Sequence, residues 1–277
     1  MRIVSGVSAA VVAAGMVLCA CDCASAGPAA DDAGDDVAPI DRLVINQYMG
    51  GHLPPDSAQL SAPAVDRELA DRFLYFGGMD LWRNGGFVHG GVVWSPDGLD
   101  RPGFTFKLLV AGGRYQYRSG TVDIVGTQGL AAAMPGWRFK VANLEILVLG
   151  GLDLQSHRLA PDDPANALRG THVGGRVNVD VWYQPTDKLM AALSLSGSSV
   201  DPNLWTRAAV GWRLYDLAWV GPEGIVFTDA RYQEYRAGVH VTSLRTGPVE
   251  LSLGLGYVID SDHRAGAYGR LGIITRQ

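Results

Sequence analysis

Apolar and polar residues alternate along much of this chain, and the clearest run is VELSLGLGYVI at residues 249–259. Its odd positions are all apolar, whereas its even positions include Glu250, Gly254 and Gly256. A period of two residues predicts a β-strand with one apolar face. Apolar residues on one face, with polar residues and glycine on the other, over about ten residues are typical of a strand in a transmembrane β-barrel.

The same alternation recurs from residue 72 onward and predicts an all-β domain over residues 72–277. Pro135 and Gly136 are expected to break or bend the fourth strand, and Pro222 and Gly224 to make the ninth irregular. An even number of strands suits an antiparallel up-and-down transmembrane β-barrel of about 12 strands. We expect strands at residues 72–82, 86–95, 104–117, 121–139, 144–158, 171–183, 188–199, 204–215, 217–227, 231–242, 249–259 and 266–275.

The connections between these strands predict how the barrel is oriented. Those after even-numbered strands are mostly short, which is typical of periplasmic turns, although SPDGLDRPG after the second strand is longer. The APDDPANALR loop follows the fifth strand and is expected on the outer side. A second outer polar segment is expected around Thr228 and Asp229.

The N-terminal region differs from the rest of the chain. Residues 1–26 predict a signal peptide, with an apolar stretch after Arg2 and an A-x-A cleavage site at residues 24–26. The alternative is a lipobox, in which Cys21 would carry a lipid. Residues 27–71 begin with the acidic segment GPAADDAGDDVAP and predict a mostly disordered periplasmic tether, with AVDRELADR as a candidate short helix. All three cysteines fall within residues 1–26, so we expect no disulfide in the exported domain.

Composition narrows the class of protein. The net charge is −5, whereas a nucleic-acid-binding domain is usually basic. A soluble β-sandwich would present Lys, Glu, Thr and Ser to water, but here Gly, Ala, Arg, Asn and Asp dominate the polar faces, and only three of the 23 basic residues are lysines. The apolar faces carry aromatic residues suited to the two membrane surfaces: Tyr75, Tyr183, Trp212, Tyr235 and Tyr257.

Longer motifs stand in order along the predicted barrel. They are FGGMDLWRNGGFVHGGVVWSPDGLDRPGF, MPGWRF, GLDLQSHRLAPDDPANALRGTHVG, DVWYQPT and YRAGVHVTSLRTGPVELSLGLGY. Together they resemble the cellulose biosynthesis protein BcsS family over residues 74–275. The resemblance implies an accessory role in making, exporting or anchoring cellulose, with cellulose and other cellulose synthesis subunits as partners beside outer-membrane lipid. It implies no catalytic residue and no cofactor.

Ionisable residues on the polar faces are expected to line the barrel interior. Such groups at membrane depth face inward and pair with one another. They would either select a solute by charge in an open pore, or form an arginine–carboxylate network that fills a closed barrel. Twelve strands enclose an interior of intermediate width, so both interpretations stand. The candidates are Asp153, Arg176, Asp180, Arg207, Arg213, Arg236, His240, Glu250 and Arg270.

Four aromatic residues are expected near the outer rim: Trp82, Tyr115, Tyr117 and Trp205. Aromatic rings stack against the C–H faces of sugar rings, so these residues are candidates for glucan contact. The alternative is that they belong to the membrane-interface belt.

Catalytic interpretations have weaker support. His157, His172, His240 and scattered serines leave an outer-membrane acyl hydrolase open, but no Ser/His spacing stands out. Asp162 and Asp163 would supply the two carboxylates of a glycosidase, but their PDDP segment is typical of a turn. The chain shows no dinucleotide, P-loop or zinc spacing, so we expect neither a cofactor nor a metal.

Overall fold

The computed structural model describes residues 71–119, 122–163, 166, 168–200, 202–229, 232–261 and 263–277. The predicted signal peptide, the lipobox alternative and residues 27–70 of the predicted tether lie outside the described residues. The same holds for most of the candidate short helix. Within the described part of the chain, no helix has the length and apolar character needed to cross a membrane.

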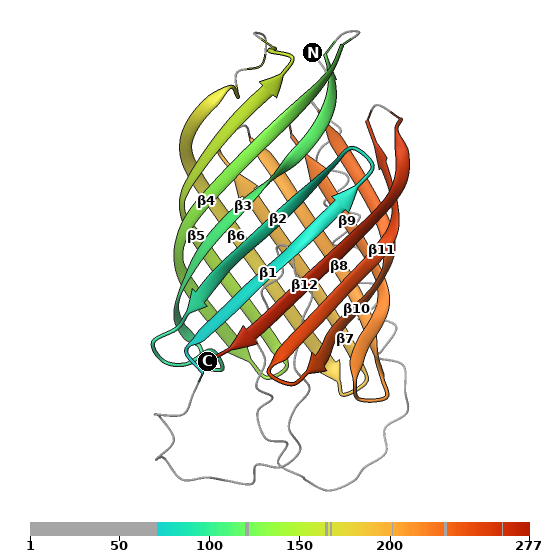
Figure 1. Cartoon of the computed structure of the whole chain (residues 1–277). Coiled ribbons are helices and arrows are strands. Elements are labelled where there is room, and N and C mark those ends of the chain that lie inside the picture. The colour runs from blue at the N-terminus through green and yellow to red at the C-terminus, as the bar shows by residue number, and fades with distance from the viewer. Residues whose placement is uncertain are drawn as a thin grey trace, which may run out of the picture.

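Twelve antiparallel strands close into one barrel, as the alternation predicted (Figure 1). Each strand pairs with its neighbours in sequence, and β1 closes the barrel against β12. The strands are β1 (Phe73–Trp82), β2 (Gly85–Trp94), β3 (Gly103–Ser119), β4 (Val122–Val141), β5 (Leu144–Ala160), β6 (Gly170–Thr186), β7 (Leu189–Ser198), β8 (Asn203–Leu214), β9 (Ala218–Thr228), β10 (Gln233–Thr246), β11 (Val249–Asp260) and β12 (Ala265–Arg276).

The predicted break in the fourth strand is wrong, because β4 runs through Pro135 and Gly136 as one strand of 20 residues. Pro135 faces outward and lies opposite Phe106 of β3, and the β4–β5 register is the same on both sides of it. Gly136 lies so close to the Val148 carbonyl of β5 that a Cβ there would overlap it. The strand therefore continues through Pro135 and Gly136, with a full ladder to β3 and a gap at Met134 and Pro135 in the ladder to β5.

The ninth strand runs unbroken but is irregular on one side. β9 keeps one register with β10 through Pro222 and Gly224, whereas its pairing with β8 skips Gly221 and Pro222. A further irregularity occurs in β10, where the register with β11 shifts between Val241 and Leu244. Ser243 has a φ of 64° at this point, which is the left-handed conformation typical of a bulge.

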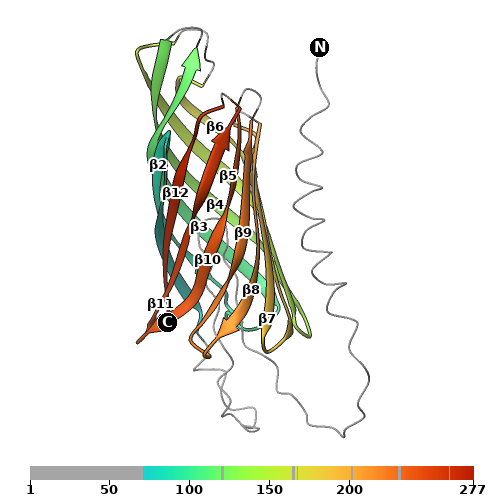
Figure 2. The ribbon, with the colours of Figure 1, turned by 90° about the vertical axis from the view of Figure 1, so that its right-hand side faces the viewer.

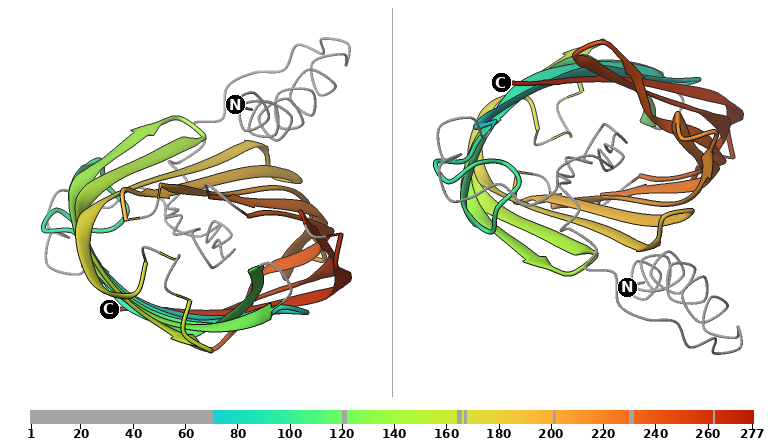
Figure 3. Two further views of the ribbon diagram at one scale, coloured as in Figure 1. Left: turned by 90° about the horizontal axis from the view of Figure 1, so that it is seen from above. Right: turned by 90° about the horizontal axis from the view of Figure 1, so that it is seen from below.

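The alternation of each strand separates an apolar outer wall from a buried interior. Figure 3 shows the closed ring of strands from its two ends. On β5, for example, Leu152 is 68% exposed, whereas Leu149 is 1% exposed. The predicted belt aromatics Tyr75, Trp212, Tyr235 and Tyr257 are all exposed on the outer wall. An apolar wall of this kind is stable only in contact with lipid.

The two ends of the barrel differ. We call the end that holds Phe73 and Arg276 the lower end and the opposite end the upper end (Figure 1). Strands β3 to β6 have 17, 20, 17 and 17 residues, whereas β7, β8 and β9 have 10, 12 and 11. The longer strands carry one side of the wall above the rest at the upper end, as Figure 2 shows for the β3–β4 hairpin.

The long connection between β2 and β3 packs against the interior at the lower end. Leu99 of this connection is fully buried in a cluster with Leu74, Val93 and Leu109. Its N–H donates to the Asp71 carbonyl at 2.8 Å, and its carbonyl accepts from the guanidinium of Arg138. This connection is longer than the other turns at the lower end, and its extra residues place Leu99 in the interior.

Candidate functional site

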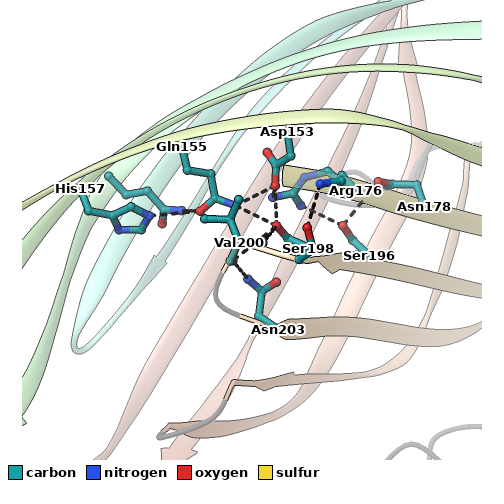
Figure 4. A network of polar contacts seen from close by, with 12 residues as sticks. Asp153, Gln155, His157, Arg176, Asn178, Ser196, Ser198, Val200 and Asn203 are labelled. Atoms are coloured by element: carbon teal, nitrogen blue, oxygen red, sulfur yellow. Dashed lines mark hydrogen bonds and ion pairs between the residues drawn. The ribbon is translucent and has the colours of Figure 1, made fainter. Parts of the chain in front are cut away.

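The interior polar groups gather into networks, and the first lies on β5, β6 and β7 (Figure 4). Arg176 donates to Asp153 at 2.9 Å and to the Ser196 hydroxyl at 3.0 Å. Asp153 also accepts from Ser198 at 2.5 Å and from Gln155 at 2.7 Å. Asp153 is fully buried, and Arg176, Ser198 and Gln155 supply the hydrogen bonds that its buried carboxylate needs.

The same network continues toward the upper end. Gln155 contacts His157 at 3.1 Å, and the other ring nitrogen of His157 lies 3.2 Å from the Tyr115 hydroxyl. Tyr117, stacked on Tyr115 with ring centroids 6.2 Å apart, donates to Asp163 at 2.8 Å. A continuous polar track therefore runs from Asp153 up to the β5–β6 loop.

A second network joins β8, β9 and β12 around Glu223 of β9. Its carboxylate accepts hydrogen bonds from Arg207 and Arg270, each at 2.8 Å, and from the Tyr268 hydroxyl at 3.0 Å. β9 and β12 are not neighbours, so the Arg270–Glu223 pair spans β10 and β11. Gly254 of β11 lies under this pair, where a Cβ would overlap the carboxylate. Gly254 of β11 therefore leaves room for the contact between Arg270 and Glu223.

The third network centres on Arg236 of β10. Its guanidinium donates to Asp80 of β1 and to Glu234, each at 2.6 Å. It also lies over the rings of Trp82 and Tyr268, at 4.5 and 5.6 Å from their centroids. Planar, delocalised arginine suits this combination of two carboxylates and two aromatic faces better than lysine does.

At the upper end, the β9–β10 connection adds a phenol to this network. The Tyr232 hydroxyl donates to Glu234 at 2.8 Å. Burial raises the pKa of the Tyr232 phenol, and the neighbouring Glu234 carboxylate raises it further. Tyr232 therefore remains a hydrogen-bond donor at neutral pH.

The remaining predicted interior residues are more scattered. Arg213 lies near the lower end, where it pairs with Asp216 at 3.1 Å. His240 contacts Thr242 and the Val210 carbonyl. Asp180 and Glu250 are also buried on inward positions of β6 and β11.

All four candidate glucan-contact residues face the interior. Trp205 is buried with Ile225, Val258 and Tyr268, and Trp82 packs against the same cluster. Tyr115 and Tyr117 share the inward face of β3 and join the polar track described above. The membrane-belt alternative is therefore wrong for these residues, because none of them lies on the outer wall.

The described contacts give little support to catalytic chemistry. His172 contacts the Arg169 carbonyl, and the contacts of His157 and His240 are to tyrosine, glutamine, threonine and backbone groups. Among the described residues, these contacts assemble no Ser–His pair. Asp162 pairs with Arg169 in an exposed loop. The described chain also contains no group of three or more side chains that would hold a metal ion.

Several interior residues were missed from sequence. Asp80 was missed because both faces of β1 are largely apolar, and Glu223 because it stands between Pro222 and Gly224. Lys107 is fully buried on the inward face of β3, over the Phe76 ring. Its place on the face of β3 opposite the apolar outward residues is a sequence signal for an inward position.

A closed antiparallel barrel with an apolar outer wall and a buried, charged interior defines a transmembrane β-barrel protein. A family model described as "Cellulose biosynthesis protein BcsS" matches residues 74–277, which is the whole barrel. The chain belongs to this family. No curated protein matches the chain.

Solved structures resemble the barrel at low sequence identity. KdgM porin is 12% identical, with 73% of this chain and 98% of that chain covered and a TM-score of 0.42. LpxR from Salmonella typhimurium is 11% identical, with 73% and 99% covered and a TM-score of 0.45. The translocator domain of autotransporter NalP from Neisseria meningitidis is 11% identical, with 76% and 90% covered and a TM-score of 0.41. Similarity at this level carries no inference about function.

Proposed function

We propose that this protein is an accessory component of cellulose biosynthesis in the outer membrane, where it supports the export or surface anchoring of the polymer. The lower end faces the periplasm and the upper end faces the cell exterior. Family membership and the apolar outer wall support this placement. So does the APDDPANALR loop at the upper end, since longer loops in such barrels lie outside the cell.

The observation that carries the proposal is the inward orientation of aromatic rings at the upper end. Trp82 stacks on Phe87 with ring centroids 5.9 Å apart and nearly parallel planes, and it lies beside Arg236. Tyr115 and Tyr117 form a second stack beside His157 and Asp163. Rings that meet the C–H face of a sugar, next to charged groups that bond its hydroxyls, are the chemistry that recognises a neutral glucan.

The test is deletion followed by complementation, with cellulose yield and attachment to the cell surface as readouts. We expect deletion to lower at least one of these quantities, and Tyr117→Ala to reproduce the defect. Tyr117→Phe keeps the ring and should restore function even though it loses the bond to Asp163. Trp212→Ala, which removes a ring from the outer wall, is the matched control. Cellulose yield and attachment that survive deletion unchanged would refute the proposal.

A structural or adhesive barrel without a pore is the second candidate. This candidate is favoured by two buried arginine–carboxylate pairs that occupy the interior, Arg270–Glu223 and Arg236–Asp80. Each pair joins strands that are not neighbours in the barrel. Conductance of the purified protein in a planar bilayer separates the two candidates. An impermeable barrel would favour the structural or adhesive candidate, whereas stable channels blocked by soluble cello-oligosaccharides would favour cellulose export.

A further inference from the structure

Charge on the outer wall is confined to one side of the barrel. In the upper half of the barrel, among strand residues whose exposure is described, the charged side chains that face outward are Arg114 of β3, Asp123 of β4 and Arg158 of β5. The outward positions of the other strands at this level are apolar or uncharged. A charged group on a lipid-facing wall is unfavourable unless it reaches the headgroup layer or a ligand.

The two arginines stand on either side of the open space over Gly129, which we call the hollow. Arg114 pairs in register with Thr127, and Thr127 pairs with Arg158, so the arginines stand two strands apart, at about 10 Å. Directly below Thr127 on the same face is Gly129, where a Cβ would meet no atom within 4 Å. Ser156 of β5 lies beside this glycine in register. The outer wall is therefore open at Gly129, with a hydroxyl group beside it.

An apolar strip continues the hollow downward. Val110, Ala131, Leu154 and Val173 follow one another in register across β3 to β6. Val110 is 59% exposed and Val173 is 71% exposed. The surface therefore changes over a few residues from guanidinium groups, through glycine and hydroxyl groups, to exposed aliphatic side chains.

The height of the arginines matches the surface of a membrane. Phe104 and Arg114 lie on the same face of β3, ten residues apart. At about 3.3 Å per residue and a tilt of about 40°, this separation corresponds to roughly 25 Å along the barrel axis. That height is close to the apolar band of an outer-membrane barrel. Arg114 and Arg158 therefore stand at the outer edge of the band.

We propose that the outer wall of β3 to β5 binds a phosphorylated, multiply acylated glycolipid of the outer leaflet. Its phosphate is held by Arg114 and Arg158, and its sugar lies over Gly129 beside the hydroxyls of Thr127 and Ser156. Its acyl chains lie along the apolar strip that contains Leu154. Arginine suits this role because its planar group bonds phosphate through two parallel N–H donors. The outward acidic residue of β4, Asp123, lies four residues above Thr127 and is therefore not beside the hollow.

The inference rests on the outer-membrane placement proposed above, but it does not depend on cellulose. The experiment uses the purified full-length barrel in detergent and measures lipid binding by native mass spectrometry. The probes are bis-phosphorylated lipid A, the same lipid without phosphates, and inorganic phosphate. Because no cellulose is present, the result is independent of the cellulose assays. The variants are the double substitution Arg114→Gln/Arg158→Gln and, separately, Gly129→Leu, which fills the hollow without changing charge.

We expect the double variant to bind phosphorylated lipid A roughly tenfold or more weakly, because two charge-assisted contacts are lost. Gly129→Leu should also weaken binding, and the phosphate-free lipid should bind the native barrel as weakly as the double variant binds lipid A. Arg169→Gln, at an exposed loop arginine paired with Asp162, is the control and should leave affinity unchanged. All barrels must keep their heat-dependent gel shift.

Three results would overturn the inference. The first is unchanged affinity in the double variant. The second is unchanged affinity in Gly129→Leu, since the glycolipid would then not occupy the hollow. The third is displacement of the lipid by millimolar inorganic phosphate, which would reveal a site for free anions.

Discussion

Replacing Glu223 with glutamine is expected to destabilise the barrel strongly. The carboxylate is 4% exposed and neutralises two buried guanidinium groups, those of Arg207 and Arg270, each at 2.8 Å. Glutamine has nearly the same shape and keeps an oxygen for the Tyr268 hydroxyl, so the substitution removes charge while leaving little cavity. The two arginines would then be buried close together without a counter-charge.

The expected cost follows from the burial of the pair. Breaking a buried ion pair by removing one partner costs about 3–5 kcal/mol, because the remaining charge is left without a partner. Glu223→Gln should therefore lower the ratio of folded to unfolded protein by roughly two to four orders of magnitude. The matched control is Asp162→Asn, which removes a carboxylate from an exposed pair with Arg169. An exposed pair contributes at most about 1 kcal/mol.

The assay is reversible unfolding in urea with the barrel in lipid vesicles, followed by tryptophan fluorescence and by the gel mobility of the unheated protein. The expected order of free energies of unfolding is native, then Asp162→Asn close to it, then Glu223→Gln far below. If Glu223→Gln unfolds within about 0.5 kcal/mol of the native barrel, Glu223 does not hold the arginines as described. Equal losses in both variants would refute the reasoning in the same way.

Three further predictions concern packing in the interior, all read from the same unfolding experiment. Gly254→Ala should lower the free energy of unfolding, because its Cβ would overlap the Glu223 carboxylate, whereas Gly129→Ala should leave it nearly unchanged. Equal losses of unfolding free energy in the two variants would contradict this steric difference. Leu99→Ala should cost about 2–5 kcal/mol, because Leu99 is fully buried, and a cost near zero would mean that the β2–β3 connection is not packed against the interior. Arg236→Lys should cost about 1–2 kcal/mol, since lysine keeps the charge but loses the forked hydrogen bonds and the stacking; a neutral result would show that charge alone suffices.

The strands were predictable from sequence because a barrel in lipid imposes one rule on every segment. An outward residue meets acyl chains and an inward residue meets the barrel contents, so a period of two is visible even where turn signals are weak. The strand through Leu251 and Leu253 shows this pattern, and the structure confirms its ends within one residue. The predicted break at Pro135 is wrong, because whether a missing backbone N–H interrupts a strand depends on how the partner strands pair with it.

The contents of the interior were less predictable. Sequence alternation shows that Arg270 faces inward, but not that it reaches past two strands to Glu223 on β9. Such contacts depend on the diameter of the barrel and on glycines such as Gly254, which have no effect on alternation. The orientation of Trp82 and Trp205 was ambiguous for a related reason, because an aromatic residue is compatible with either face near the end of a strand.

Membrane fractionation tests most directly whether this chain forms a closed barrel in the outer membrane. The full-length protein, produced in its native host, would be separated on a density gradient and run on a gel with and without heating. We expect the protein to sediment with the outer membrane and to migrate differently before and after heating, as a closed barrel does. A protein recovered in the soluble periplasmic fraction, with the same mobility before and after heating, would contradict it.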